Sequence, residues 1–331
     1  MSSRRYPATR LTLLAVALLL LGLLAASQGA MRLPLNVAWG AADDSLRHIW
    51  WQIRLPRVLL AVLVGGALAL SGCVMQGVFR NPLADPGLLG ISSGAALAVG
   101  IAVVLLPALP ATLQLWLPML AAFAGSLGVT LTIFMLCRRA SLSLATLLLM
   151  GIAINALAGA ALGVLSWISN DQQLRQLSLW GMGSLGQARW AMLAACAALM
   201  IPAMLVVLRQ AAALNLLQTG DEEAWYLGVN VARVRLWLLT GSALLVAGAV
   251  AVSGVIGFIG LVIPHLLRLF GGADHRWLLP GAALAGAMLL LGADTLARTA
   301  VAPAEMPVGL LTSLLGGPGF LWLIYRQRRG R

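Results

Sequence analysis

The sequence predicts an all-α polytopic membrane protein with about ten transmembrane helices. Of its 331 residues, 61% are hydrophobic and only 10% are charged, whereas soluble domains carry about 25% charged residues. The mean hydropathy of the whole chain is +0.94, so the apolar residues are not confined to one anchor. The apolar runs are long and continuous, which favours helices over the alternating segments of a transmembrane barrel. This composition excludes an ordinary soluble enzyme, a disordered chain and a secreted disulfide scaffold.

The first apolar run, residues 11–26, follows Arg4, Arg5 and Arg10 and in isolation has the form of a signal peptide. We interpret it as a retained first helix because many further spans follow. The next candidate spans are residues 58–78, 88–107, 115–136, 147–167 and 190–208. Each has about the 20 residues that a helix needs to cross a bilayer.

A long uncharged stretch then runs from residue 236 to 264 and, with its flank to residue 270, exceeds one span. Ser253, Gly254, Gly257 and Gly260 cluster in its middle, where glycine makes a tight reversal easiest. We therefore divide it into helices at 236–255 and 256–270. Helices at 277–297 and 308–325 complete the ten.

Arginine counting predicts the orientation. All 22 basic residues are arginine, and 15 of the 22 fall in inside segments if both termini are cytoplasmic. Cytoplasmic loops of membrane proteins are enriched in basic residues, so we expect a multi-pass membrane protein with both termini in the cytoplasm. The arginines form no stripe interleaved with stacking aromatics, which argues against nucleic-acid binding.

No catalytic or metal-binding motif is present. The sequence contains no HExxH, GxSxG or GxxxxGK[ST] pattern, so we expect neither an enzyme nor a chain that binds ATP phosphates itself. Cys73, Cys137 and Cys196 form no CxxC pair and are interpreted as packing residues. The three histidines lie far apart, so we expect no metal site.

The segment 210–230 is the longest predicted cytoplasmic loop. It contains Asp221, Glu222 and Glu223 and ends near Gly228. Thr219 is a candidate cap for a short helix with acids in its first turn and glycine at its end. Such a helix outside the bilayer would be a handle for a soluble partner; the alternative is a solvated loop.

Two predicted helices carry small residues at a spacing of four, which places each set on one helical face. The first set is Gly151, Asn155, Gly159 and Gly163; the second is Gly309, Ser313 and Gly317. Small-residue faces allow close helix packing, but they would equally suit the wall of a pathway for a large solute.

Arg54, Arg57 and Arg298 lie near the outer ends of predicted helices. Arginine binds carboxylates with two parallel hydrogen bonds, so these residues could meet an acidic soluble partner. They could equally anchor the helices at lipid headgroups. Asp294 and Arg298 have the i, i+4 spacing of a pair along one helix.

Several long motifs resemble the FecCD permeases, the membrane subunits of ABC importers for ferric siderophores, heme and cobalamin. They are Arg54-Leu-Pro-Arg57, GGALALSG at 65–72, NPLADPGLLGISSGA at 81–95, LGVN at 227–230, GFIGLVIPH at 257–265, DHR at 274–276 and EMPVG at 305–309. The resemblance covers nearly the whole chain in the right order.

The resemblance implies the type II ABC importer permease fold, with residues 1–331 as a single transmembrane permease domain. It implies a homodimer with the pathway at the dimer interface, two cytoplasmic ATPase subunits that hold ATP and magnesium, and a periplasmic substrate-binding protein. No cofactor is expected on this chain itself.

The resemblance also assigns roles to residues. The coupling helix that contacts the ATPase would comprise Gly220, Asp221, Glu222, Glu223, Ala224, Leu227 and Gly228. Arg54, Arg57 and Arg298 match positions that dock the binding protein. The fifth and tenth helices, with the two small-residue faces, would line the pathway. A cytoplasmic gate is expected at Ser143, Leu144, Ala145 and Thr146.

The sequence of residues 179–185 and 303–309 is most similar to that of heme (hemin) permeases, with cobalamin and ferric-siderophore permeases as alternatives. A rival from another class is an ion-coupled secondary carrier. Such a carrier would need intramembrane carboxylates, for which Asp294 is the sole candidate. A third class, an intramembrane enzyme, is disfavoured because the sequence offers no nucleophile–base or metal set.

Overall fold

The computed structural model describes residues 5–29, 31, 37, 44–106, 110–139, 144–302 and 304–329. The backbone in these ranges forms helices and turns, without a strand. Seven of the helices are long and apolar enough to cross a membrane, and three shorter apolar helices accompany them. Together they account for the ten predicted spans and confirm the all-helical membrane fold.

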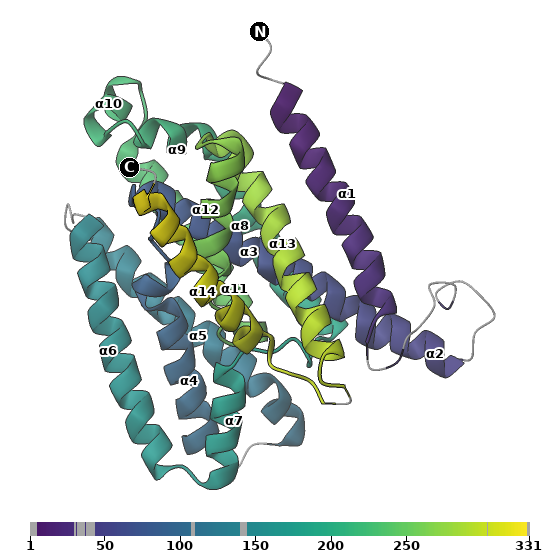
Figure 1. The fold of residues 1–331 in the computed structure, drawn as a ribbon. Helices are drawn as coiled ribbons and strands as arrows, with labels where there is room; N and C mark the ends of the chain where they lie inside the picture. Colours follow the sequence, from purple (N-terminus) through teal and green to yellow (C-terminus); the bar gives the residue numbers. More distant parts are fainter. Residues whose placement is uncertain are drawn as a thin grey trace.

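The elements form one bundle of helices (Figure 1). In chain order they are α1 (Arg5–Ser27), α2 (Asp44–His48), η2 (Ile49–Arg54), α3 (Leu55–Val78), η3 (Pro86–Leu89), α4 (Ile91–Leu105), α5 (Ala111–Arg139), α6 (Leu144–Ile168), α7 (Asp171–Gly181), α8 (Trp190–Arg209), α9 (Ala211–Leu217), α10 (Asp221–Tyr226), α11 (Val231–Ser253), α12 (Ile259–Gly271), α13 (His275–Thr299) and α14 (Val308–Arg329).

The two ends of the bundle differ. Helices α9 and α10 lie at the end where α1 begins and α14 finishes, which we call the α10 end (Figure 1). Helix α7 lies at the opposite end, the α7 end. Both termini of the described chain thus approach the same side, as an even number of spans requires. Which end faces the cytoplasm remains a prediction from the arginine count.

Helix α3 forms the centre of the bundle and packs against α13, α11 and α12. Glycines bring the backbones close together: a Cβ added to Gly65 would lie 2.5 Å from the carbonyl oxygen of Gly286 on α13. At Gly72 a Cβ would collide with the carbonyl of Gly260 on α12. The glycine-rich motif at 65–72 is therefore explained by close packing of this central helix.

The predicted reversal within residues 236–270 is confirmed. Helix α11 ends at Ser253 and α12 begins at Ile259. Gly254 has φ +68° and Phe258 has φ +69°, a left-handed conformation that ends a helix readily at glycine. The glycine cluster thus marks the break between the two helices.

The structure departs from the predicted spans in two places. The second span does not begin near residue 58 but continues a helical segment that starts at Asp44 and passes through η2. Helix α7 was missed altogether. Its start carries a capping box, in which the Asn170 side chain accepts from the Gln173 N–H and the Gln173 side chain accepts from the Asn170 N–H. That signal is visible in the sequence, but α7 is too short and polar for a span.

Candidate functional site

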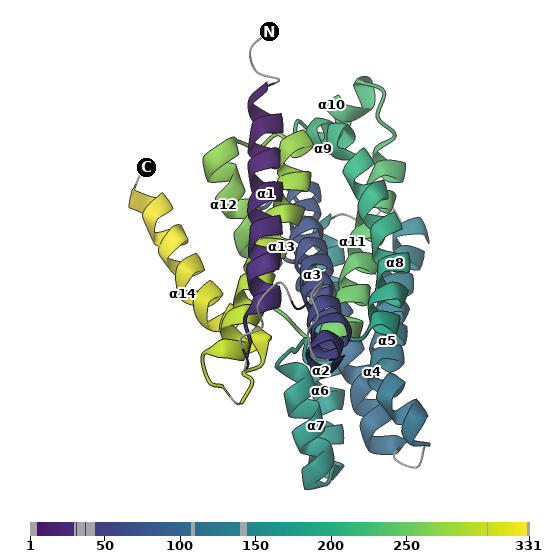
Figure 2. The same cartoon turned by 90° about the vertical axis from the view of Figure 1, so that its right-hand side faces the viewer.

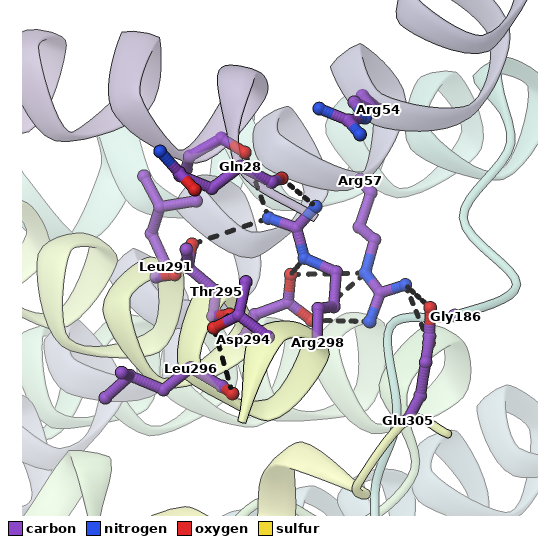
Figure 3. A network of polar contacts seen from close by, with 12 residues as sticks. Gln28, Arg54, Arg57, Gly186, Leu291, Asp294, Thr295, Leu296, Arg298 and Glu305 are labelled. Atoms are coloured by element: carbon purple, nitrogen blue, oxygen red, sulfur yellow. Dashed lines mark hydrogen bonds and ion pairs between the residues drawn. The ribbon is translucent and has the colours of Figure 1, made fainter. Parts of the chain in front are cut away.

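Arg54, Arg57 and Arg298 come together at the α7 end with Asp294 and Glu305 (Figure 3). We call these five residues the arginine cluster. Arg54 ends η2, Arg57 lies in the first turn of α3 and Arg298 in the last turn of α13. The three arginines are only 5–6% exposed. The sequence predicted that these arginines, at the outer ends of helices, would be exposed. In the structure they are buried.

Asp294 is fully buried and binds two of the arginines. The Nη2 group of Arg57 donates to its Oδ1 at 2.9 Å, and Nε of Arg57 lies 3.1 Å from both carboxylate oxygens. Nε of Arg298 lies 3.1 Å from Oδ2, which confirms the predicted i, i+4 pair. Because a buried charge is stable only when it is paired, Asp294 holds α3 and α13 together.

Arg57 also binds a second carboxylate. Its Nη1 group donates to Glu305 at 2.9 Å and 3.1 Å. Glu305 belongs to the segment 304–307 between α13 and α14, and its side chain is 50% exposed. Sequence reasoning missed this partner, although Glu305 begins one of the quoted motifs. Arg57 therefore links α3 both to α13 and to the segment that leads into α14.

The other two arginines fasten the end of α1. Arg54 donates to the carbonyls of Ala26 and Ser27, each at 2.9 Å, and to that of Met31. Arg298 donates to the carbonyls of Ala25 and Gln28 at 3.1 and 3.2 Å. Carbonyls at a helix C-terminus lack intrahelical partners and favour cations. The arginines thus already have intramolecular partners, and their docking role remains a prediction.

The predicted coupling loop contains two short helices, α9 and α10, instead of one. Thr219 is not the cap: its hydroxyl donates to the Leu216 carbonyl, and Gly220, with φ +144°, precedes α10. Gly228 has φ +85° and ends the segment as predicted. At the tip, Trp225, Tyr226 and Leu227 are 66%, 79% and 62% exposed. Such exposed apolar side chains outside a bilayer suit contact with a soluble partner.

Ion pairs fasten α10 to two spans. The Asp221 carboxylate binds Arg80, just after α3, and lies 2.7 Å from Nη2 of Arg235 on α11. Arg80 also donates from Nε to the Leu217 carbonyl at 2.8 Å. Partial burial opposes ionisation of Asp221, but the hydrogen bonds and charges of Arg235 and Arg80 outweigh it and lower the pKa of the carboxyl. The pair is therefore intact at neutral pH, and a displacement of α10 would reach α3 and α11.

Replacing Asp221 by asparagine tests this connection. Exposed pairs contribute about 0.2–1 kcal/mol each, so we expect little change in thermal stability. We expect fewer solute molecules imported per ATP hydrolysed, because α10 would no longer be held to α3 and α11. The measurement is paired ATPase and uptake rates in proteoliposomes, with Glu222→Gln as the charge-matched control in the same turn. An unchanged ratio in Asp221→Asn would contradict a connecting role.

The first small-residue face divides into two halves. A Cβ on Gly151 would collide with the Leu88 carbonyl, so this glycine packs α6 against η3. Asn155 accepts a 2.6 Å hydrogen bond from the Ser93 hydroxyl and donates to the Gly87 carbonyl at 3.2 Å. Gly159 and Gly163 are exposed, and a Cβ on either would meet no atom within 4 Å. The second half of α6 thus offers an open small-residue surface.

The second face is only partly open: Gly317 is half-buried, and a Cβ added to it would lie 3.8 Å from the Phe258 ring. Gly309 is buried where a Cβ would collide with the Met182 carbonyl, whereas Ser313 is exposed. Helix α14 packs against α13 and α12 and leans away from the bundle (Figure 2). Of the predicted gate, Ser143 lies outside the described residues, and Leu144, Ala145 and Thr146 form the first turn of α6.

The division of α6 predicts opposite effects for two alanine substitutions. We expect Gly151→Ala to destabilise the protein by about 1–3 kcal/mol, the usual cost of overpacking, and Gly159→Ala to be tolerated. Thermal unfolding of the purified protein measures both. Gly159→Leu is expected to leave the protomer folded and stop uptake. If this variant loses thermal stability together with transport, the open half of α6 serves packing and not passage.

A cavity of about 500 Å³ opens at the α7 end between α5, α7, α8 and the end of α11. Polar side chains of α7 line one wall, among them Gln172, Arg175 and Gln176. Glu305, Met306 and Pro307 line another. The arginine cluster therefore borders this cavity through Glu305.

Comparisons with known proteins agree on one family. Residues 14–326 match the FecCD transport family. The chain is 63% identical to the hemin transport system permease protein HmuU of Yersinia pestis, over 100% of this chain and 99% of that protein. It is 47% identical to the vitamin B12 import system permease protein BtuC of Salmonella schwarzengrund, over 84% of each chain. A solved structure of a putative metal-chelate type ABC transporter in an inward-facing conformation has a TM-score of 0.86 at 34% identity, covering 96% of this chain and 98% of that one.

Proposed function

The chain belongs to the FecCD transport family, and we propose that it is the permease through which hemin crosses a bacterial inner membrane toward the cytoplasm. It is a multi-pass ABC transporter permease. The observation that carries hemin as the cargo is the high identity to a hemin permease over the full length of both chains. The vitamin B12 relative is less similar and matches a smaller share.

The proposed mechanism is alternating access driven by a separate ATPase. In this proposal ATP binds to the ATPase and not to this chain. The free energy of ATP hydrolysis therefore reaches the permease through a mechanical contact with the ATPase. Helix α10 suits that contact, because its apolar tip is exposed and its Asp221 is tied to two spans. Its displacement would tilt α3 and α11 and open or close the pathway.

The proposed assembly is a homodimer with two cytoplasmic ATPase subunits and a periplasmic binding protein. The open half of α6, at Gly159 and Gly163, supports a pathway between the two copies, since small residues leave room for a large planar solute. The binding protein would dock at the α7 end, where the arginine cluster lies. No cofactor is assigned to this chain; ATP and magnesium would belong to the ATPase.

The geometry of Asp294 argues against an ion-coupled carrier. This carboxylate is fully buried between Arg57 and Arg298. A carboxylate that transports a proton must lose and regain it during the cycle. Asp294 is instead engaged by two guanidinium groups in ion pairs that join α3 and α13, so its role here is structural.

Uptake into proteoliposomes tests the proposal. The permease is reconstituted with its ATPase and supplied with binding protein and hemin, cobalamin or a ferric siderophore. We expect hemin uptake that requires ATP and the binding protein. Uptake of cobalamin or the siderophore, with no uptake of hemin, would overturn the assignment of hemin as the cargo. Uptake driven by a sodium or proton gradient without ATP would overturn the transporter class.

A further inference from the structure

The two carboxylates on Arg57 differ in their access to solvent. Asp294 is fully buried, whereas the Glu305 side chain is 50% exposed. The Arg57 side chain between them is only 8% exposed. A buried pair is lost only at a high cost, but water and other ions compete readily for an exposed carboxylate. Asp294 is thus a fixed partner of Arg57, and Glu305 is an exchangeable one.

The hydrogen bonds of Arg57 allow this exchange without disturbing the buried pair. Nε and Nη2 donate to Asp294, while Nη1 donates to Glu305 (Figure 3). A carboxylate from another molecule could replace Glu305 at Nη1 while Asp294 remains in place. One ion pair would be exchanged for another, so the exchange would be nearly balanced in free energy.

Release of Glu305 would affect the segment that leads into α14. Two backbone contacts also hold this region: the N–H of Met306 donates to the Ala297 carbonyl at 3.2 Å, and that of Gly309 to the Gly183 carbonyl at 3.3 Å. Glu305, Met306 and Pro307 form one wall of the cavity at the α7 end. Loss of the Glu305 pair would loosen both this wall and the start of α14.

We propose that Glu305 is an intramolecular competitor for Arg57, a latch that holds segment 304–307 until a carboxylate of a docking protein displaces it. The partner it fits is an acidic protein surface that approaches the α7 end. The inference rests on the proposed function in one respect, namely that the periplasmic binding protein docks at the arginine cluster. Docking would then loosen the start of α14 directly.

The variant Glu305→Gln tests the latch, with Asp171→Asn as its control. Asp171 is an exposed acid in the first turn of α7, so its loss removes the same charge at the same end. Any general gain from reduced repulsion of an acidic partner appears in both variants. Only Glu305→Gln removes the competitor from Arg57.

The first measurement uses the reconstituted transporter without binding protein. Amide hydrogen exchange of residues 304–309 is expected to be faster in Glu305→Gln than in the wild type and in Asp171→Asn. Equal exchange rates in all three would overturn the latch. Because no partner is present, this result is independent of hemin transport.

The second measurement is the affinity of the cognate binding protein for the transporter in lipid nanodiscs. At low salt we expect Glu305→Gln to bind roughly 1.5- to fivefold more tightly than Asp171→Asn, the range that loss of a half-exposed ion pair permits. The affinity of Glu305→Asp, which has a shorter side chain of the same charge, should lie between those of Asp171→Asn and Glu305→Gln. Binding by Glu305→Gln that is equal to or weaker than that of the control would overturn the competition. A wild-type transporter that takes up no hemin would instead overturn the proposed function.

Discussion

Replacing Ala224 by proline is expected to abolish hemin uptake while ATP hydrolysis continues. Ala224 is buried, and its N–H donates to the Gly220 carbonyl at 3.1 Å within the six-residue helix α10. Proline removes this hydrogen bond and costs about 3 kcal/mol inside a helix, enough to unwind so short an element. A rigid helix transmits a displacement, and an unwound segment absorbs it. Paired uptake and ATPase rates in proteoliposomes with binding protein measure the loss.

A matched pair at the end of α10 separates helix rigidity from surface contact. The N–H of Leu227 donates to the Glu223 carbonyl at 3.1 Å, while its side chain is exposed. Leu227→Pro removes the hydrogen bond, and Leu227→Ala removes only the side chain. Uncoupling in the proline variant alone supports a rigid lever. Normal uptake at a normal ATPase rate in Ala224→Pro would refute the coupling role of α10.

The second large effect is expected at Asp294. The Asp294→Asn substitution keeps the size of the side chain but leaves Arg57 and Arg298 without their buried counter-charge. Breaking a buried pair from one side typically costs about 3–5 kcal/mol. We therefore expect a much lower thermal unfolding midpoint and less folded protein in the membrane.

The control for Asp294→Asn is Glu305→Gln, which removes the half-exposed carboxylate from the same arginine. Its stability cost should be no more than about 1 kcal/mol, as for exposed pairs. Equal unfolding midpoints for the two variants would show that burial of Asp294 does not set the strength of this network.

Hydropathy predicted the spans because each crossing must be apolar along its own length. The break between α11 and α12 was likewise predictable, since Gly254 and its neighbours determine it locally. The burial of Arg54, Arg57 and Arg298 was not predictable in this way. Their partners on α1 and in the segment 304–307 are distant in the sequence, and no local pattern reveals such contacts.

The sequence also treated Gly151 and Gly159 as equivalent members of one face. The structure separates them, because η3 packs against the first and nothing in the described protomer packs against the second. Asp221 was expected to favour the start of α10 through the helix dipole. In the structure it also binds Arg80 and Arg235, which flank α10 in the chain on either side.

The attachment of α1 has a consequence for the biogenesis of the protein. Helix α1 leaves the ribosome first, but two carbonyls at its end are satisfied by Arg298, near the end of the next-to-last span. Until almost the whole chain has been inserted, those carbonyls must accept hydrogen bonds from water or lipid headgroups instead. A nascent chain truncated before α13 would keep a loosely held first helix. The last hydrogen bonds at the end of α1 can therefore form only after α13 has been inserted.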